Sequence, residues 1–169
     1  MRPDEVRGAA VTEPVDPDVD LAEVRQRQEL RRSHYRVLAV IAAGGAIGAG
    51  ARYGAGLLWP TPAGAFPWTT LGVNASGCLV IGVFLVTLTE AWTAPPWLRP
   101  FLATGVLGGY TTFSTYCVDI ERLVTAGRAE TALTYLAATV VVALAAVTAG
   151  AWATRLILTA AERRKTRRT

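Results

Sequence analysis

The sequence predicts an all-α membrane protein with four membrane-spanning helices. Hydrophobic residues make up 51% of the 169 residues and gather in four blocks, at residues 37–59, 68–89, 101–118 and 131–154. Each block has close to the ~20 residues that a helix needs to cross the hydrocarbon core of a bilayer. Three blocks contain no charged residue, and the first contains only Arg52.

The connections between the blocks are marked by proline, which interrupts helices when it lies deep inside them. The six prolines between the first three blocks are Pro60, Pro62, Pro67, Pro95, Pro96 and Pro100. A soluble helical bundle is the alternative interpretation. It is disfavoured because residues 131–154 lack the polar stripe that a soluble amphipathic helix presents to water.

Charged residues are concentrated at the two ends of the chain. Residues 1–36 are acidic and then basic, and we expect a disordered cytoplasmic tail there. Within it, residues 25–36 either extend the first helix or lie on the lipid headgroups. Residues 37–155 form the expected four-helix unit, and residues 156–169 form a basic C-terminal tail.

The distribution of Lys and Arg predicts the orientation in the membrane. The flanking basic residues are Arg25, Arg27, Arg31, Arg32, Arg36, Arg155, Arg163, Arg164, Lys165, Arg167 and Arg168. The connection between the second and third blocks adds Arg99, whereas residues 60–67 carry no charge. The positive-inside rule therefore places both termini in the cytoplasm. The alternative is that the basic tails bind lipid or nucleic acid without reporting topology.

Small residues in the first block predict close helix packing. Gly44 and Gly48 are four residues apart, as are Gly50 and Gly54, and this spacing lets helix backbones approach in lipid. Such glycines most often serve packing within one chain. Four short spans make a thin bundle, however, so an ion pathway would form more easily between subunits, and we expect an oligomer.

The third block contains an unusually polar stretch, residues 108–116, with the sequence GGYTTFSTY. Gly108 and Gly109 weaken a helix, and the hydroxyl groups that follow can bond the backbone groups that a break sets free. A break also exposes carbonyl oxygens that can hold a cation. Phe113 and Tyr116 share one helical face, which on spacing alone indicates ordinary packing.

Two more polar residues within the blocks are candidates for function. Arg52 either serves the site or extends its charged group to the outer interface. Asn74 can bond a neighbouring helix or donate to an anion. Asp119 lies just beyond the third apolar core, and Cys78 and Cys117 are interpreted as packing residues. No nucleophile–base pair or metal-ligand cluster is evident in the blocks, which favours a channel over an enzyme.

Three motifs resemble those of the CrcB/Fluc family of fluoride channels. They are GGAIGAGARY at residues 44–53, TTLGVNASG at residues 69–77 and GGYTTFSTY at residues 108–116. The resemblance covers residues 37 to about 155 and implies a four-helix subunit with a broken third helix. It also implies an antiparallel dimer with two fluoride pores in a bacterial cell membrane.

The resemblance further implies roles for individual residues. A structural sodium ion, which is not transported, would be held by the carbonyls of Gly108 and Thr111 from each subunit. The fluoride pore would be lined by Asn74, Phe113, Ser114, Thr115 and Tyr116, with Arg52 and Asp119 at the vestibule. The partners expected are fluoride, the lipid bilayer and a second subunit, with no nucleic acid.

Two departures from the family pattern qualify this expectation. Tyr116 stands where the family has a second phenylalanine, and Asp119 stands where it has glutamate. The positive charge bias also suggests one fixed orientation, so we expect pairing either with a second copy or, slightly favoured, with an oppositely oriented homologue. The rival interpretations are a small multidrug exporter, which would need a buried carboxylate in the first span, and a membrane scaffold without transport.

Overall fold

A computed structural model describes residues 24–92 and 94–166 of the chain, and over these residues every regular element is helical. The predicted all-α class is therefore confirmed. The chain forms two compact units, Met1–Arg36 and Val37–Thr169, and all of the predicted site residues belong to the second. The acidic part of the predicted tail, residues 1–23, lies outside the described residues.

The helical elements follow one another with short connections. In chain order they are α1 (Val24–Leu58), α2 (Trp68–Val86), η1 (Thr87–Ala91), η2 (Pro100–Leu107), α3 (Gly108–Tyr110), α4 (Ser114–Thr125) and α5 (Ala129–Thr166), with η1 and η2 π-helical. Within the described part of the chain, three helical stretches are long and apolar enough to cross a membrane, namely Tyr35–Leu58, Trp68–Glu90 and Ala129–Ala161. They correspond to the first, second and fourth predicted blocks, and they support a multi-pass membrane protein.

The first and last helices are longer than predicted. Helix α1 begins at Val24, so the basic segment 25–36 is helical and continuous with the first span, which is one of the two arrangements expected for it. Helix α5 continues to Thr166, well beyond residue 155. Its apolar stretch of 33 residues is about 50 Å long at 1.5 Å per residue, against a hydrocarbon core of about 30 Å. The helix must therefore tilt or project from the bilayer.

The predicted third span, residues 101–118, is not a single helix. Helical structure from η2 and α3 ends at Tyr110, and α4 begins at Ser114. Between them Thr111 has extended backbone angles, with φ of −72° and ψ of 155°. Neither piece alone reaches the length of a membrane span. The first piece ends at Tyr110, the residue that follows the two glycines.

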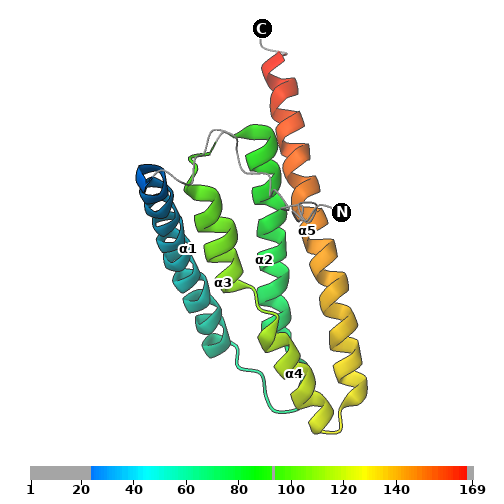
Figure 1. The fold of residues 1–169 in the computed structure, drawn as a ribbon. Helices are drawn as coiled ribbons and strands as arrows, with labels where there is room; N and C mark the ends of the chain where they lie inside the picture. The colour runs from blue at the N-terminus through cyan, green and yellow to red at the C-terminus, as the bar shows by residue number, and fades with distance from the viewer. Residues whose placement is uncertain (1–23, 93, 167–169) are drawn as a thin grey trace, which may run out of the picture. The chain divides into compact units, whose positions relative to one another are not determined.

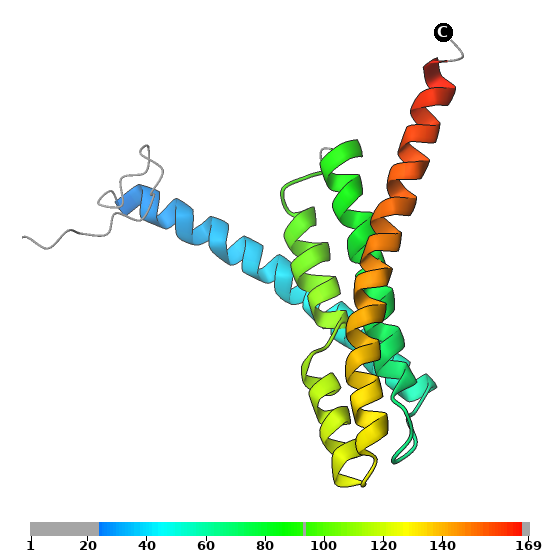
Figure 2. The same cartoon turned by 90° about the vertical axis from the view of Figure 1, so that its right-hand side faces the viewer.

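Helices α2 and α5 make the most extensive contact in the second unit, and they run side by side in Figures 1 and 2. The contact depends on one glycine from each helix. A Cβ on Gly82 would overlap the Val147 carbonyl oxygen, and a Cβ on Gly150 would overlap that of Leu79. The two backbones therefore approach as small-residue helix pairs do in lipid.

Helix α1 packs against η2 in a similar way. A Cβ on Gly44 or on Gly48 would overlap backbone of η2, and for Gly48 the overlap is with the Val106 carbonyl oxygen. Gly50 and Gly54 have no such neighbour within 4 Å. Only the first of the two predicted glycine pairs therefore serves packing within this chain.

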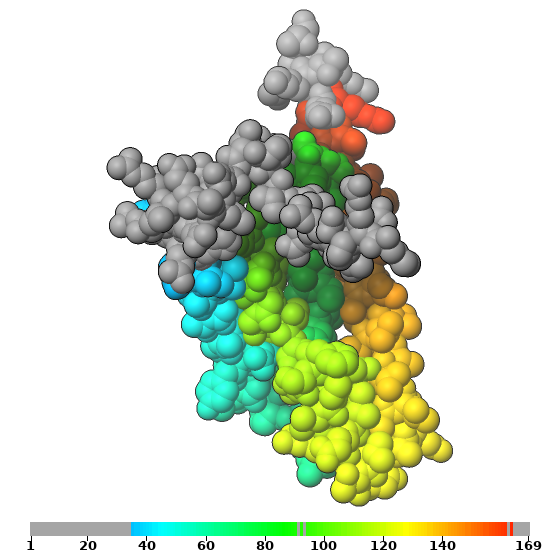
Figure 3. Space-filling model, viewed as in Figure 1, coloured from blue at the N-terminus to red at the C-terminus, as the bar shows by residue number. Residues whose placement is uncertain are grey.

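Helix α4 packs on the first turns of α5, as Figure 3 shows at the lower end of the molecule. The buried residues of this contact are Tyr116, Leu123, Ala132 and Tyr135. The chain reverses at Gly127, whose φ of +72° suits a residue without a side chain. This reversal returns α5 along α4 and brings Tyr135 beside Tyr116.

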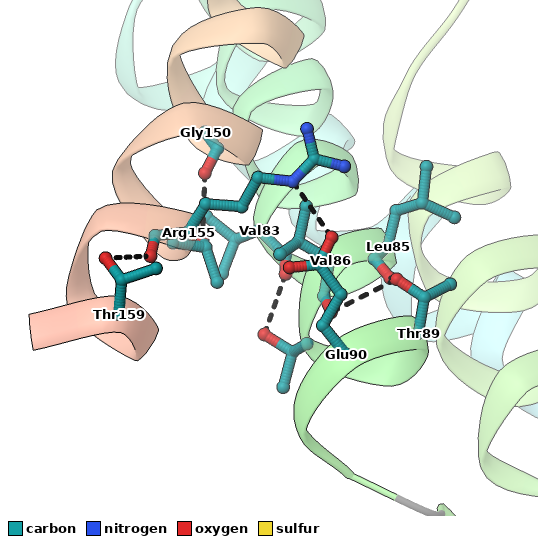
Figure 4. Close-up of polar contacts among 10 residues, drawn as sticks. Val83, Leu85, Val86, Thr89, Glu90, Gly150, Arg155 and Thr159 are labelled. Carbon is teal, nitrogen blue, oxygen red and sulfur yellow. Dashed lines mark hydrogen bonds and ion pairs between the residues drawn. The ribbon is translucent and has the colours of Figure 1, made fainter. Parts of the chain in front are cut away.

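An ion pair joins α5 to η1 at the end of the molecule where α5 projects, as Figure 4 shows. Arg155 Nε lies 2.9 Å from Glu90 Oε1, and both side chains are exposed. Arg99 Nη2 donates to the Leu88 carbonyl of η1 at 3.2 Å. Basic side chains often bond the last carbonyls of a helix in this way. Arg155 and Arg99 thus both bond groups at the end of the second span.

Candidate functional site

The site is built around the non-helical segment 111–113 between α3 and α4. Asn74 of α2 is buried and holds this segment through both atoms of its amide. The Thr112 N–H donates to Asn74 Oδ1 at 2.8 Å, and Asn74 Nδ2 donates to the Thr112 carbonyl at 2.9 Å. The amide thus replaces the backbone partners that Thr112 would have in a helix.

Two further side chains bond backbone groups around the same segment. Arg52 Nε of α1 donates to the Gly109 carbonyl at 3.1 Å. The Thr115 N–H donates to Thr112 Oγ1 at 3.1 Å, so the Thr112 hydroxyl caps the start of α4. Arg52 thus reaches the backbone beside the non-helical segment, and its functional role stays a prediction.

These bonds release two particular carbonyl oxygens. In an unbroken helix the Gly108 carbonyl would accept from the Thr112 N–H, and the Thr111 carbonyl from the Thr115 N–H. Both donors are used instead by side-chain oxygens, those of Asn74 and Thr112. The carbonyls of Gly108 and Thr111 therefore lose the donors that they would have in a helix. These are the two carbonyls that the family resemblance implies as sodium ligands, and that role stays a prediction.

A pocket of about 450 Å³ lies between α1, α2 and the non-helical segment. Its polar lining comes from Arg52, Thr69, Thr70, Thr112 and Thr115. Because Arg52 uses Nε to reach Gly109, its other guanidinium nitrogens can serve this pocket. Three of the threonine hydroxyls already donate, Thr69 to the Trp59 carbonyl, Thr70 to Asp119 and Thr112 to Thr115 Oγ1. This leaves the positive charge of Arg52 and the Thr115 hydroxyl to offer hydrogen bonds to a small anion.

Asp119 lies close to this first pocket, next to its lining residue Thr70. Thr70 Oγ1, from the first turn of α2, donates to Asp119 Oδ2 at 2.7 Å. The hydrogen bond joins α4 to α2 and satisfies one oxygen of the carboxylate. The structure thus places Asp119 near Arg52's pocket, although it brings Thr70 and not Arg52 into contact with it.

A second pocket, of about 400 Å³, opens on the other side of the segment. It is mostly apolar, and its lining includes Asn74, Thr112, Phe113, Tyr116 and Thr139. The Phe113 side chain is 77% exposed. Thr112 lines both pockets, so the two pockets meet at the non-helical segment.

The predicted aromatic pair divides into one exposed and one buried ring. Tyr116 is only 9% exposed and belongs to the α4–α5 core. Its hydroxyl donates to the Leu136 carbonyl of α5 at 3.1 Å. The rings of Phe113 and Tyr116 remain in contact, with centroids 5.8 Å apart. The packing that the spacing indicated is therefore found for Tyr116, whereas the Phe113 ring is exposed at the second pocket.

Sequence reasoning did not single out Thr70, Tyr135 or Thr139. Tyr135 is completely buried beside Tyr116, with ring centroids 5.3 Å apart. The signal for the α5 pair was weak: Tyr135 and Thr139 are four residues apart on one helical face, but the same block contains four other threonines. For Thr70 the signal was a pair of adjacent hydroxyl residues, Thr69 and Thr70, at the start of a span that carries no charge.

A protein-family model described as CrcB-like protein, Camphor Resistance (CrcB), matches residues 39–151. The chain belongs to the CrcB family. The CrcB match includes every predicted site residue and leaves the acidic and basic tails outside it.

Several curated relatives of this CrcB chain carry functional names. Fluoride-specific ion channel FluC 1 of Streptomyces coelicolor is 60% identical over 127 residues, which cover 75% of this chain and 82% of the relative. FluC 2 of Streptomyces avermitilis is 55% identical over 73% of this chain and 78% of its own length. FluC 2 of Nocardia farcinica is 49% identical over 75% of this chain and 91% of its own length. The predicted membership of the CrcB/Fluc family is thereby confirmed.

Proposed function

We propose that this chain is a subunit of a fluoride-selective ion channel that lets fluoride leave the cytoplasm passively and so reduces fluoride toxicity. The observation that carries the proposal is the pair of pockets that meet at Thr112. One presents Arg52 and hydroxyl groups, and the other presents the exposed Phe113 ring. The names of the relatives at 60% and 55% identity support fluoride as the ion.

The chemistry of the two pockets suits a small, strongly hydrated anion. A selective pore must replace hydration by many donors, none of which holds the ion too firmly. Arg52 and the hydroxyls of Ser114 and Thr115 would supply attraction and hydrogen bonds, whereas the Thr112 hydroxyl proton is used on Thr115 Oγ1. The edge of the Phe113 ring carries partial positive charge and can contact the anion without a full charge. Asn74 keeps one amide hydrogen free beside its bond to Thr112.

A structural sodium ion fits the donor set of the same segment. The carbonyls of Gly108 and Thr111 have lost their helical donors, and a hard cation prefers oxygen ligands of this kind. Among the described residues, His, Cys, Asp and Glu side chains do not gather in groups of three that could hold a metal. Bound sodium would supply positive charge that fixes the segment, while Asn74 and Arg52 hold the neighbouring backbone.

We propose that the third span consists of η2, α3 and α4, with the break at residues 111–113, which makes four spans in all. Two subunits would then pair antiparallel across the face that exposes Phe113. The apolar residues on that face include Ile81, Val140 and Leu144, which are 36%, 51% and 63% exposed. The charge bias favours both termini in the cytoplasm and an oppositely oriented homologue as partner, with a second copy as the alternative.

The contribution of Phe113 separates a channel from a scaffold and from an exporter. We expect Phe113→Ile to abolish growth of a fluoride-sensitive bacterial strain on fluoride, while the wild-type chain, expressed alone or with an oppositely oriented homologue, restores it. Phe84→Ile in α2, an aromatic change outside both pockets, is the matched control and should grow as wild type does. Equal growth of Phe113→Ile and wild type would support a scaffold instead.

A further inference from the structure

All five tryptophans of the chain lie near the ends of membrane-spanning helices. Trp59 and Trp68 flank the loop between α1 and α2, Trp92 and Trp97 lie in the connection between η1 and η2, and Trp152 lies in α5. Each is at least half exposed. Tryptophan is enriched at both surfaces of a membrane, where its ring sits among the lipid headgroups. The tryptophans therefore indicate the level of each headgroup layer.

The spacing of these tryptophans matches the thickness of a bilayer. From Trp68 to Trp92 the chain runs through α2 and η1 and advances about 35 Å, against a hydrocarbon core of about 30 Å. In α5, about the same rise separates Ala129 from Trp152. The residues of α5 that follow Trp152 thus lie beyond the hydrocarbon core, which favours projection of this helix from the bilayer.

Two arginines lie just beyond this tryptophan level, and both bond η1. Arg155, one turn after Trp152, donates through Nε to Glu90 Oε1 at 2.9 Å, and Figure 4 shows the rest of its guanidinium extending past that bond. Arg99 donates through Nη2 to the Leu88 carbonyl at 3.2 Å. Because a guanidinium has five N–H donors, each arginine keeps donors beyond these bonds.

The charge at this end of the molecule favours an anionic ligand. Residues 90–99 and 155–165 contain five basic and two acidic residues, whereas residues 119–130 at the other end contain two basic and three acidic ones. The side chains of Arg155 and Glu90 are 62% and 41% exposed. An ion pair this exposed contributes little to stability. A guanidinium at a membrane surface can instead hold two oxygens of one phosphate through parallel hydrogen bonds.

The proposed pairing of subunits leaves this end at the membrane surface. The apolar face ascribed to the dimer includes Ile81, Val140 and Leu144. Arg155 lies eleven residues beyond Leu144 in the same helix, a rise of about 16 Å. The arginine therefore lies at the headgroup layer, beyond the bilayer depth of that face.

We propose that Arg99 and Arg155 bind the phosphate groups of anionic phospholipids in the leaflet at this end, with Trp92, Trp97 and Trp152 among the headgroups. A phospholipid of net negative charge, such as phosphatidylglycerol, fits this site. Phosphatidylcholine fits less well, because its choline brings a positive charge beside the arginines. The site is independent of fluoride transport.

The test measures which phospholipids surround the full-length protein in reconstituted bilayers. In a background with Trp59→Phe and Trp68→Phe, brominated phospholipids quench only the three tryptophans at this end, and quenching gives the affinity for phosphatidylglycerol relative to phosphatidylcholine. We expect phosphatidylglycerol to be preferred. Arg155→Gln should reduce the preference about fivefold, the effect of one basic residue at an anionic surface. Glu90→Gln breaks the same ion pair but keeps the arginine, so the preference should persist or increase. Arg128→Gln, at the other end, should leave it unchanged.

Three outcomes would overturn the proposal. The first is equal quenching by the two phospholipids in the background protein. The second is an equal loss of preference in Glu90→Gln and Arg155→Gln, which would show that the ion pair, and not a lipid contact, is responsible. The third is displacement of phosphatidylglycerol by inorganic phosphate, which would identify a soluble anion as the ligand. If the background protein does not fold, unfolding temperatures of the wild type and the three variants in the two lipids give the same comparison. No fluoride is present, so the result is independent of the proposed channel function.

Discussion

At the scale of residues, the side-chain amide of Asn74 holds the non-helical segment in place. Asn74 uses both of its polar atoms on Thr112, so the non-helical segment exists without leaving its central residue unsatisfied. In a bilayer this matters more than in water, because an unpaired backbone group has no solvent to bond. Asn74 therefore has a structural role. Its remaining amide hydrogen can also donate into the second pocket, which Asn74 lines.

We expect Asn74→Ala to lower the free energy of unfolding by about 1–3 kcal/mol, because two hydrogen bonds are lost and two backbone groups are left unpaired. Thermal unfolding in detergent measures the effect. Thr148→Val is the control, since its hydroxyl bonds only the Leu144 carbonyl of its own helix. Equal unfolding temperatures for the two variants would show that Asn74 does not hold the segment.

The sequence predicted which residues are polar here, but not how they pair. The three motifs placed Arg52, Asn74 and the hydroxyl residues of 111–115 in apolar blocks. In the structure, Arg52 and Asn74 both bond backbone in or beside the non-helical segment 111–113. The bond from Arg52 to Gly109 and the burial of Tyr116 depend on how helices pack. Tertiary contacts of this kind leave no periodic signal in a single sequence.

At the scale of elements, glycine decides which helices come close. Gly48 faces the backbone of η2, and this approach brings Arg52, one turn further along α1, within reach of Gly109. The spacing of glycines predicted close packing in α1. It could not tell Gly48 from Gly50, because the face that a helix turns to its neighbour depends on the rest of the fold.

We expect Gly48→Ala to destabilise the protein by about 1–3 kcal/mol, as overpacking does in close-packed interiors. Gly50→Ala, two residues along the same helix, is the matched control because no atom lies near its added Cβ. The fraction of monodisperse protein after heating is the measurement. If the two alanine variants survive heating equally, α1 does not pack on η2 as described.

The third span illustrates what composition can and cannot predict about an element. Two glycines followed by hydroxyl residues indicated a weak helix, and the structure leaves the helix at Thr111. The π-helical geometry of η1 and η2 was not predicted. A π-helix has the same apolar composition as an α-helix over so few residues, so hydropathy does not distinguish them.

At the scale of the whole molecule, charge is unevenly placed. Figure 1 shows the connection after η1 and the C-terminal part of α5 at one end, and the α4–α5 turn at the other. The first end carries Arg99, Arg155, Arg163, Arg164 and Lys165, whereas the second carries Arg122 and Arg128. Such a bias favours one orientation in the membrane.

Thiol labelling of intact cells tests this orientation. In a background with Cys78→Ala and Cys117→Ala, a cysteine replacing Ala63 should react with a membrane-impermeant reagent added outside, and a cysteine replacing Pro96 should not. Both positions are exposed and lie in connections between helices. Comparable labelling at both positions would mean that the chain inserts both ways, which would favour pairing with a second copy.

The central claim is tested most directly by fluoride efflux from liposomes. The protein should be purified by a tag on this chain from its native host, so that any partner subunit comes with it, and reconstituted in sodium. A fluoride electrode should then record rapid loss of trapped fluoride, while liposomes loaded with chloride retain their chloride. Folded protein that releases neither ion, or both at similar rates, would contradict a fluoride-selective channel.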